Sequence, residues 1–96
     1  MVVHLLAAAG IIPMATEVRD GPDGSYRVDV RLSESVYVEV DGYAYHSSPQ
    51  QKRYDERRRN QLRLGGKHLL VYTWWDVVHD GGRVVAELRE ALQRYR

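Results

Sequence analysis

Residues 36–46, with the sequence VYVEVDGYAYH, decide the fold that we expect for this chain. In the first six residues, valines alternate with Tyr37, Glu39 and Asp41, which predicts a half-buried strand with its carboxylates on one face. Gly42 then permits a bend, and His46 follows four positions later. The stretch therefore places two carboxylates, a turn and a histidine within eight residues.

A second alternating run, residues 26–32, lies just before this strand and predicts a hairpin. With a three-residue loop at 33–35, Asp29 lies opposite Glu39 and the apolar faces of both strands agree. A two-residue loop would instead place Asp29 on the face of Val38. We therefore predict the three-residue loop, with Asp29 and Glu39 directly opposed.

Two carboxylates that face each other across strands destabilise a hairpin by roughly 0.2–1 kcal/mol. Two arrangements can offset this cost. Arg27 and Arg31 can neutralise a solvated hairpin face, or a bound cation can bridge Asp29 and Glu39. The pairing of the two acids leaves both possibilities open.

The remaining chain predicts helices around this hairpin. Residues 50–64 predict a helix, and the near-continuous apolar run at 68–73 predicts a buried parallel strand, so that strand, helix and strand form a β-α-β unit. Trp74 and Trp75 begin a turn or short helix, and we expect core and edge packing of the two rings rather than stacking on nucleic-acid bases. A last amphipathic helix covers the sheet. Further elements are a short helix at 2–9 and a weak first strand at 14–19.

The helix at 50–64 is unusually basic, with only Tyr54, Leu62 and Leu64 as clear core-forming residues. Asp55 and Arg58 (or Arg59) share a stripe with Leu62 by helical spacing. We expect either an inward Asp55–Arg58 pair beside the acidic strand face or an ordinary helical ion pair. The basic residues of this helix are Lys52, Arg53, Arg57, Arg58, Arg59 and Arg63.

Composition limits the class of protein. Ninety-six residues with 44% hydrophobic and 28% charged residues predict one globular domain, 1–96. The absence of cysteine excludes disulfides and thiolate zinc sites. The apolar segment 1–12 is too short to span a bilayer, so we expect a soluble, cytoplasmic protein with no membrane partner.

Residues 1–48 carry three arginines and seven acids, whereas residues 49–96 carry eleven basic residues and six acids. Two interpretations of this asymmetry stay open. The acidic half could bind a metal ion and the basic half a polyanion, or the charges could simply be solvated on the surface.

The ordered set of motifs resembles the very short patch repair (Vsr)-like endonuclease domain family, a branch of the PD-(D/E)XK nuclease superfamily. The set comprises Asp29, Glu39-Val40-Asp41-Gly42, His46, Asp55-x-x-Arg58 and a glycine–strand–Trp-x-Asp-Val segment. The resemblance covers about residues 26–92. It implies an α/β fold with a restriction-endonuclease-like core: a mixed sheet built from a hairpin and a β-α-β unit, with a C-terminal covering helix.

The resemblance also implies a divalent-metal site. Asp29, Glu39 and the backbone carbonyl of Val40 would bind Mg²⁺ or Mn²⁺, and His46 would act as general base or acid. Asp55 and Arg58 match the helical residues that close the site. Asp41 stands where the superfamily has its lysine, so we count it among the catalytic candidates without the lysine's role.

We therefore expect a metal-dependent DNA endonuclease that nicks or cleaves DNA by phosphodiester hydrolysis. The alternatives are a catalytically inactive nucleic-acid-binding or regulatory module of the same fold, and a protein-interaction fragment. The chain is expected to act alone, as a homodimer or as part of a larger protein. The residues expected to contact the DNA backbone are Lys52, Arg53, Arg57, Arg58 and Arg59.

Overall fold

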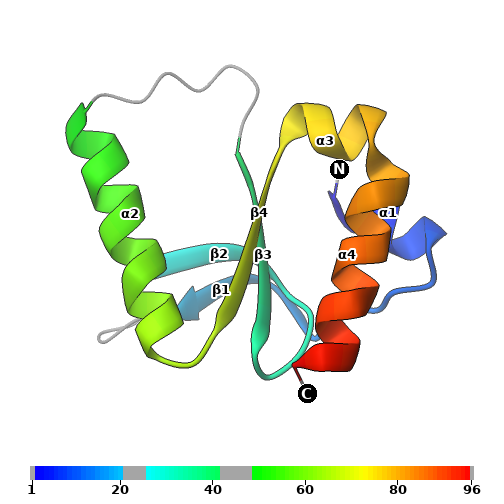
Figure 1. Ribbon diagram of the computed structural model, residues 1–96, viewed down its shortest axis with the longest axis horizontal. Coiled ribbons are helices and arrows are strands. Elements are labelled where there is room, and N and C mark those ends of the chain that lie inside the picture. The colour runs from blue at the N-terminus through cyan, green and yellow to red at the C-terminus, as the bar shows by residue number, and fades with distance from the viewer. Residues whose placement is uncertain (1, 21–25, 42–48, 96) are drawn as a thin grey trace.

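The computed structural model describes residues 2–20, 26–41 and 49–95 (Figure 1). The predicted order of helices and strands is confirmed, with boundaries shifted by one or two residues. In chain order, the elements are α1 (Val2–Ala8), β1 (Ala15–Asp20), β2 (Tyr26–Arg31), β3 (Val36–Asp41), α2 (Pro49–Leu64), β4 (His68–Thr73), α3 (Trp74–His79) and α4 (Gly81–Arg94).

The four strands form one mixed sheet in the order β1-β2-β3-β4. The β1–β2 and β2–β3 pairs are antiparallel, whereas β3 and β4 are parallel and are connected through α2. A parallel pair needs a long crossover, which α2 supplies. The predicted mixed α/β fold, with a hairpin followed by a β-α-β unit and a C-terminal helix, is confirmed.

The register of the β2–β3 hairpin is the predicted one. Val30 lies opposite Val38 in this pair. Continuing that register by one residue places Asp29 opposite Glu39. The N–H of Leu32 donates to the carbonyl of Val36, at 2.8 Å, and closes the three-residue loop. Both acids therefore lie on the face of the hairpin that does not carry the valines.

The valine face of the sheet forms the main core. In Figure 1, α1, α3 and α4 lie on one side of the sheet and α2 lies on the other. Because strand residues alternate between faces, Val30 of β2 and Val36, Val38 and Val40 of β3 point toward α1, α3 and α4. The fully or nearly buried residues of this core include Leu6, Val30, Val36, Val38, Tyr72, Val77, Val84 and Leu88.

The opposite face of the sheet packs against α2 through a small cluster. Tyr37 and Leu62 are buried there, with Leu69 partly buried against them. Tyr54 and Leu64 were expected in the core, but that expectation is wrong, because their side chains are 49% and 80% exposed. Leu64 lies about 200° around the helix from Leu62 and so faces solvent. With so little apolar packing, the interface between α2 and the sheet depends on its polar contacts.

The two C-terminal helices follow their sequence patterns. The amphipathic α4 buries Val84, Val85, Leu88 and Ala91, as its periodicity predicts. The shorter α3 buries Val77. Within the described residues, no helix is both long enough and apolar enough to cross a bilayer.

Candidate functional site

Asp29 lies on the same face of the hairpin as Glu39. Its side chain is half-buried, and its Oδ2 accepts a hydrogen bond from the backbone N–H of Val40, at 2.8 Å. The contact fixes the carboxylate beside β3 and uses one of its two oxygens. Asp29 is therefore held at the position where the sequence predicts a metal ligand.

Glu39 is the buried acidic residue of this face, and α2 supplies its counter-charges. The residue is 7% exposed. Its Oε1 forms a salt bridge with Nη2 of Arg58, and its Oε2 accepts a hydrogen bond from Nε of Arg59, at 3.2 Å. The side chains of Arg58 and Arg59 are themselves only 13% and 14% exposed. We call Arg58 and Arg59 the guanidinium clamp.

The clamp explains how two facing carboxylates are tolerated. A buried carboxylate without a counter-charge is costly, and two hydrogen-bonded guanidinium groups offset that cost. Arg31 is one of the arginines expected to neutralise the two carboxylates, but its guanidinium donates instead to the carbonyl of Ser33 and to Glu34. The offsetting charges thus come from α2, while the side chain of Arg27 lies outside the described part of the structure.

Asp55 does not form the predicted inward pair with Arg58. Its Oδ1 accepts a hydrogen bond from Nε2 of Gln51, at 3.1 Å, and its side chain is half-buried. The predicted stripe itself is correct, because Arg58 and Leu62 both face the sheet. Arg58 instead reaches across to Glu39 of β3.

Two of the predicted catalytic residues are not placed by the structure. His46 lies outside the described residues, and so does the side chain of Asp41, whose backbone pairs with Thr73 of β4. Val40 is half-buried and follows Glu39 in β3, so its backbone carbonyl lies on the same strand as that carboxylate. The roles of these three residues in the site remain predictions.

Asp29 and Glu39 fit a divalent cation by their chemistry. Carboxylate oxygens are the ligands that Mg²⁺ prefers, and one or two carboxylates commonly suffice, with water and substrate phosphate completing the set. Among the residues that the structure describes, no three acidic or histidine side chains gather into a ready metal cluster. A cation at this position would therefore share Glu39 with the guanidinium clamp or displace it.

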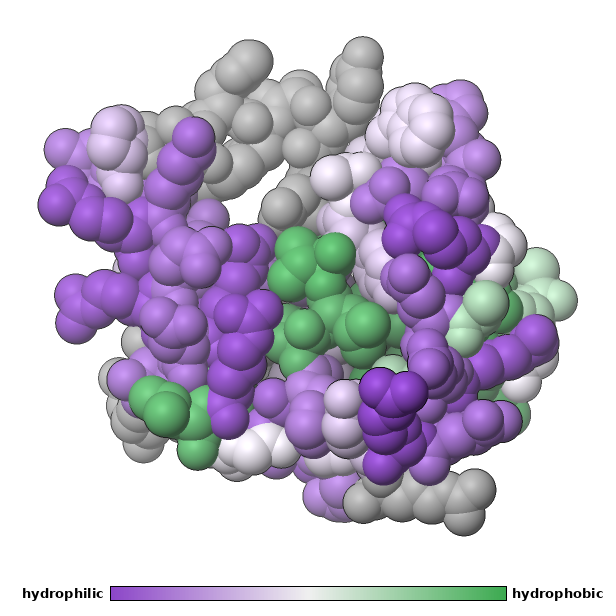
Figure 2. Space-filling model, viewed as in Figure 1, coloured by the Kyte–Doolittle hydropathy of each residue, from purple (hydrophilic) through white to green (hydrophobic). Residues whose placement is uncertain are grey.

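The exposed basic residues of α2 form a separate surface. Lys52, Arg53 and Arg57 are exposed, and we call them the basic surface. Figure 2 shows hydrophilic residues along the side of the molecule that α2 forms. Arg58 and Arg59, for which phosphate contacts are also predicted, pair with Glu39, and their contact with DNA stays a prediction.

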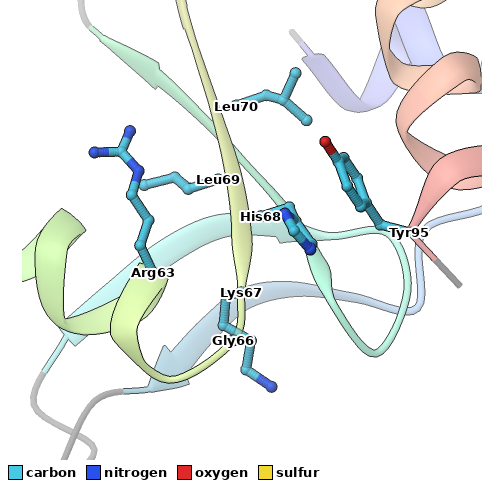
Figure 3. Close-up of a pocket in the computed structure, with 7 residues that line it drawn as sticks. All are labelled: Arg63, Gly66, Lys67, His68, Leu69, Leu70 and Tyr95. Carbon is cyan, nitrogen blue, oxygen red and sulfur yellow. The ribbon is translucent and has the colours of Figure 1, made fainter.

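A pocket of about 410 Å³ lies at the opposite end of β4 from Thr73 (Figure 3). In it, the rings of His68 and Tyr95 stack with centroids 3.5 Å apart. Arg63 and Leu69 line the side toward α2. Neither Asp29 nor Glu39 lines this pocket, so a ligand bound in it would not contact the two carboxylates.

Arg59 also belongs to the site, and helical spacing alone does not predict this. The spacing puts Arg58 or Arg59 on the inward stripe but pairs that stripe with Asp55. The sequence does contain a sign of this role. The helix has little apolar surface and covers the strand face that bears Glu39, so it must supply positive charge to that carboxylate. Two adjacent arginines on such a helix meet that need.

Comparison with known proteins identifies the fold. No protein-family model matches the sequence, and no curated protein matches it. Among solved structures, the catalytic domain of the homing endonuclease I-Bth0305I is similar, with a TM-score of 0.64 and 20% sequence identity. The similarity covers 98% of this chain and 87% of that one. The chain therefore shares the fold of that domain, in agreement with the predicted mixed α/β core.

Proposed function

We propose that this protein is a metal-dependent DNA endonuclease domain of the Vsr-like type. The observation that carries the proposal is the opposition of Asp29 and Glu39 on a covered hairpin face, within the fold of an endonuclease catalytic domain. Carboxylate oxygens on rigid strands are suited to bind the divalent cation that would assist phosphodiester hydrolysis. The substrate is DNA, and the reaction is nicking or cleavage of its backbone.

Each part of the site has a proposed task. Asp29 and Glu39 would hold Mg²⁺ or Mn²⁺, together with the carbonyl of Val40. The bound ion would supply positive charge that stabilises the charge developing on the phosphate. His46 would transfer a proton to or from water, and the hydrogen bond from Val40 to Asp29 keeps the carboxylate oriented.

The basic surface would hold the DNA backbone. Changing Lys52, Arg53 and Arg57 to glutamate should weaken DNA binding strongly, because basic side chains that bind phosphates release counterions. The slope of log affinity against log salt should become shallower by about one for each phosphate that the variant no longer neutralises. Fluorescence anisotropy with a labelled duplex at several salt concentrations measures both quantities.

The matched control is Arg94→Glu, which reverses an exposed arginine of α4. This variant should keep the wild-type affinity and slope, because α4 lies across the sheet from α2 (Figure 1). Wild-type binding by the triple variant would remove α2 from the DNA-binding surface.

A second candidate function is a DNA-binding module that has lost catalysis. The observation that favours it is the guanidinium clamp, which engages both carboxylate oxygens of Glu39. Asp41 in place of the superfamily lysine favours it too. Calorimetric titration with Mn²⁺ separates the two candidates: an endonuclease should bind the ion and lose binding in Asp29→Asn, whereas the inactive module should show no heat of binding.

A further inference from the structure

An aromatic surface on α3 is not explained by packing. Trp75 is 56% exposed, although Val77, two positions later, is 6% exposed. The ring of His79 lies beside Trp75, with centroids 5.2 Å apart. Trp74 is half-buried and its ring contacts that of His79, with centroids 6.2 Å apart, whereas Trp75 departs from the expected packing. Tryptophan is highly buried on average, so a mostly exposed one is informative.

The helix that carries Trp75 is firmly held. Its first turn has a capping box, in which Thr73 Oγ1 accepts from the N–H of Asp76 and Asp76 Oδ2 accepts from the N–H of Thr73. The hydrogen bond from the Thr73 backbone is the main cause that holds the pKa of Asp76 below its usual range. Arg83 of α4 donates to Asp76 at 3.0 Å. A rigid platform loses little conformational entropy when a ligand binds to it.

The aromatic surface lies at the same end of the sheet as the candidate site. Thr73, the last residue of β4, pairs with Asp41, the last residue of β3, and α3 begins directly after it. In Figure 1, α3 and the first turns of α2 lie on either side of this end of the sheet. Those turns carry Lys52 and Arg53. A DNA strand held by α2 at this end can therefore extend its bases toward α3.

The geometry points to Trp75, with His79 beside it, as a stacking site for an unpaired nucleobase of DNA. This inference rests on the proposed function in taking DNA as the ligand. Every base has a π-face that an exposed aromatic ring can cover. Bases within an intact duplex are already stacked on their neighbours, so the ligand is a base in a bulge, a gap or a single strand. The positive charge of α2 holds the phosphates while the ring holds the base.

Two labelled duplexes, identical except for one bulged 2-aminopurine, test the inference. Binding is measured with the whole chain in the presence of a chelator, so that no DNA is cut. Wild type should bind the bulged duplex more tightly and quench the 2-aminopurine fluorescence. The affinity of Trp75→Ala for the bulged duplex should be about 5- to 150-fold lower than that of the wild type, since stacking one base contributes about 1–3 kcal/mol. Trp75→Phe should retain part of the affinity and the quenching.

The matched control is Val78→Ala, which truncates another exposed apolar side chain of α3, 46% exposed, and should leave both readouts unchanged. Lys52→Glu should weaken binding to both duplexes equally. Retention of wild-type affinity and quenching by Trp75→Ala would overturn the inference. Equal wild-type binding to both duplexes would overturn it while leaving the proposed endonuclease standing, whereas no binding to either duplex would overturn both.

Discussion

Changing both Arg58 and Arg59 to alanine should lower the free energy of unfolding by about 3–5 kcal/mol. Glu39 is 7% exposed, and the two guanidinium groups are its counter-charges from α2. Without them, the carboxylate stays buried and uncompensated, which is among the most destabilising changes that a side chain can cause. The same change also weakens the packing of α2 on the sheet, because the buried apolar contact of α2 is made through Leu62. Urea denaturation followed by circular dichroism measures the loss.

The control variant removes the same charge from the same helix. Lys52→Ala with Arg53→Ala truncates two exposed residues and should change stability by no more than about 0.5 kcal/mol. Adding Glu39→Gln to the Arg58/Arg59 variant should recover part of the lost stability, because the buried group is then neutral. A loss below about 1 kcal/mol in the Arg58/Arg59 variant would show that the clamp does not hold α2 on the sheet.

Asp29→Asn should lower the rate of DNA cleavage by at least about 100-fold, with little effect on the fold. Changes to groups that merely support metal ligands typically cost about 10–100-fold in affinity or activity, so loss of a ligand charge should cost at least as much. The asparagine carbonyl can still accept the hydrogen bond that Val40 donates to Asp29. The single-turnover cleavage rate measures the effect.

Two further measurements make the Asp29→Asn result interpretable. The variant should keep the wild-type unfolding midpoint in urea and the wild-type affinity for DNA in the presence of chelator. Glu34→Asn is the control for loss of a carboxylate, because Glu34 lies in the hairpin loop with its side chain 81% exposed. Its cleavage rate should remain that of the wild type. An Asp29→Asn protein that folds, binds DNA and cleaves at the wild-type rate would exclude Asp29 from the site.

The sequence predicted the hairpin well because one choice of register satisfied every residue in it. A two-residue loop would have placed Asp29 on the face of Val38 and mixed the apolar and charged faces, so the apolar pattern determined that Asp29 faces Glu39. The parallel strand β4 was predictable for a related reason. A strand that is covered on both faces reads as a continuous apolar run, as residues 68–73 do.

The polar contacts across elements could not be predicted in the same way. Helical spacing shows which residues of α2 share a face, but it does not show which strand residue that face meets. Arg58 was therefore paired with Asp55 on its own helix, whereas in the structure it reaches Glu39. The exposure of Trp75 was hidden for a similar reason, because adjacent residues of a helix point in different directions and only the packing decides which is buried. Trp74 is half-buried, whereas Trp75 is 56% exposed.

Incubation of supercoiled plasmid with the purified protein and Mg²⁺ or Mn²⁺ tests the proposed activity most directly. Parallel reactions contain excess chelator, or the Asp29→Asn variant in place of the wild type. A metal-dependent endonuclease should convert supercoiled DNA to nicked or linear forms in the wild-type reactions with metal and in neither parallel reaction. DNA that stays supercoiled with wild type and either metal, at protein concentrations that saturate DNA binding, would contradict the proposed function and favour the inactive DNA-binding module.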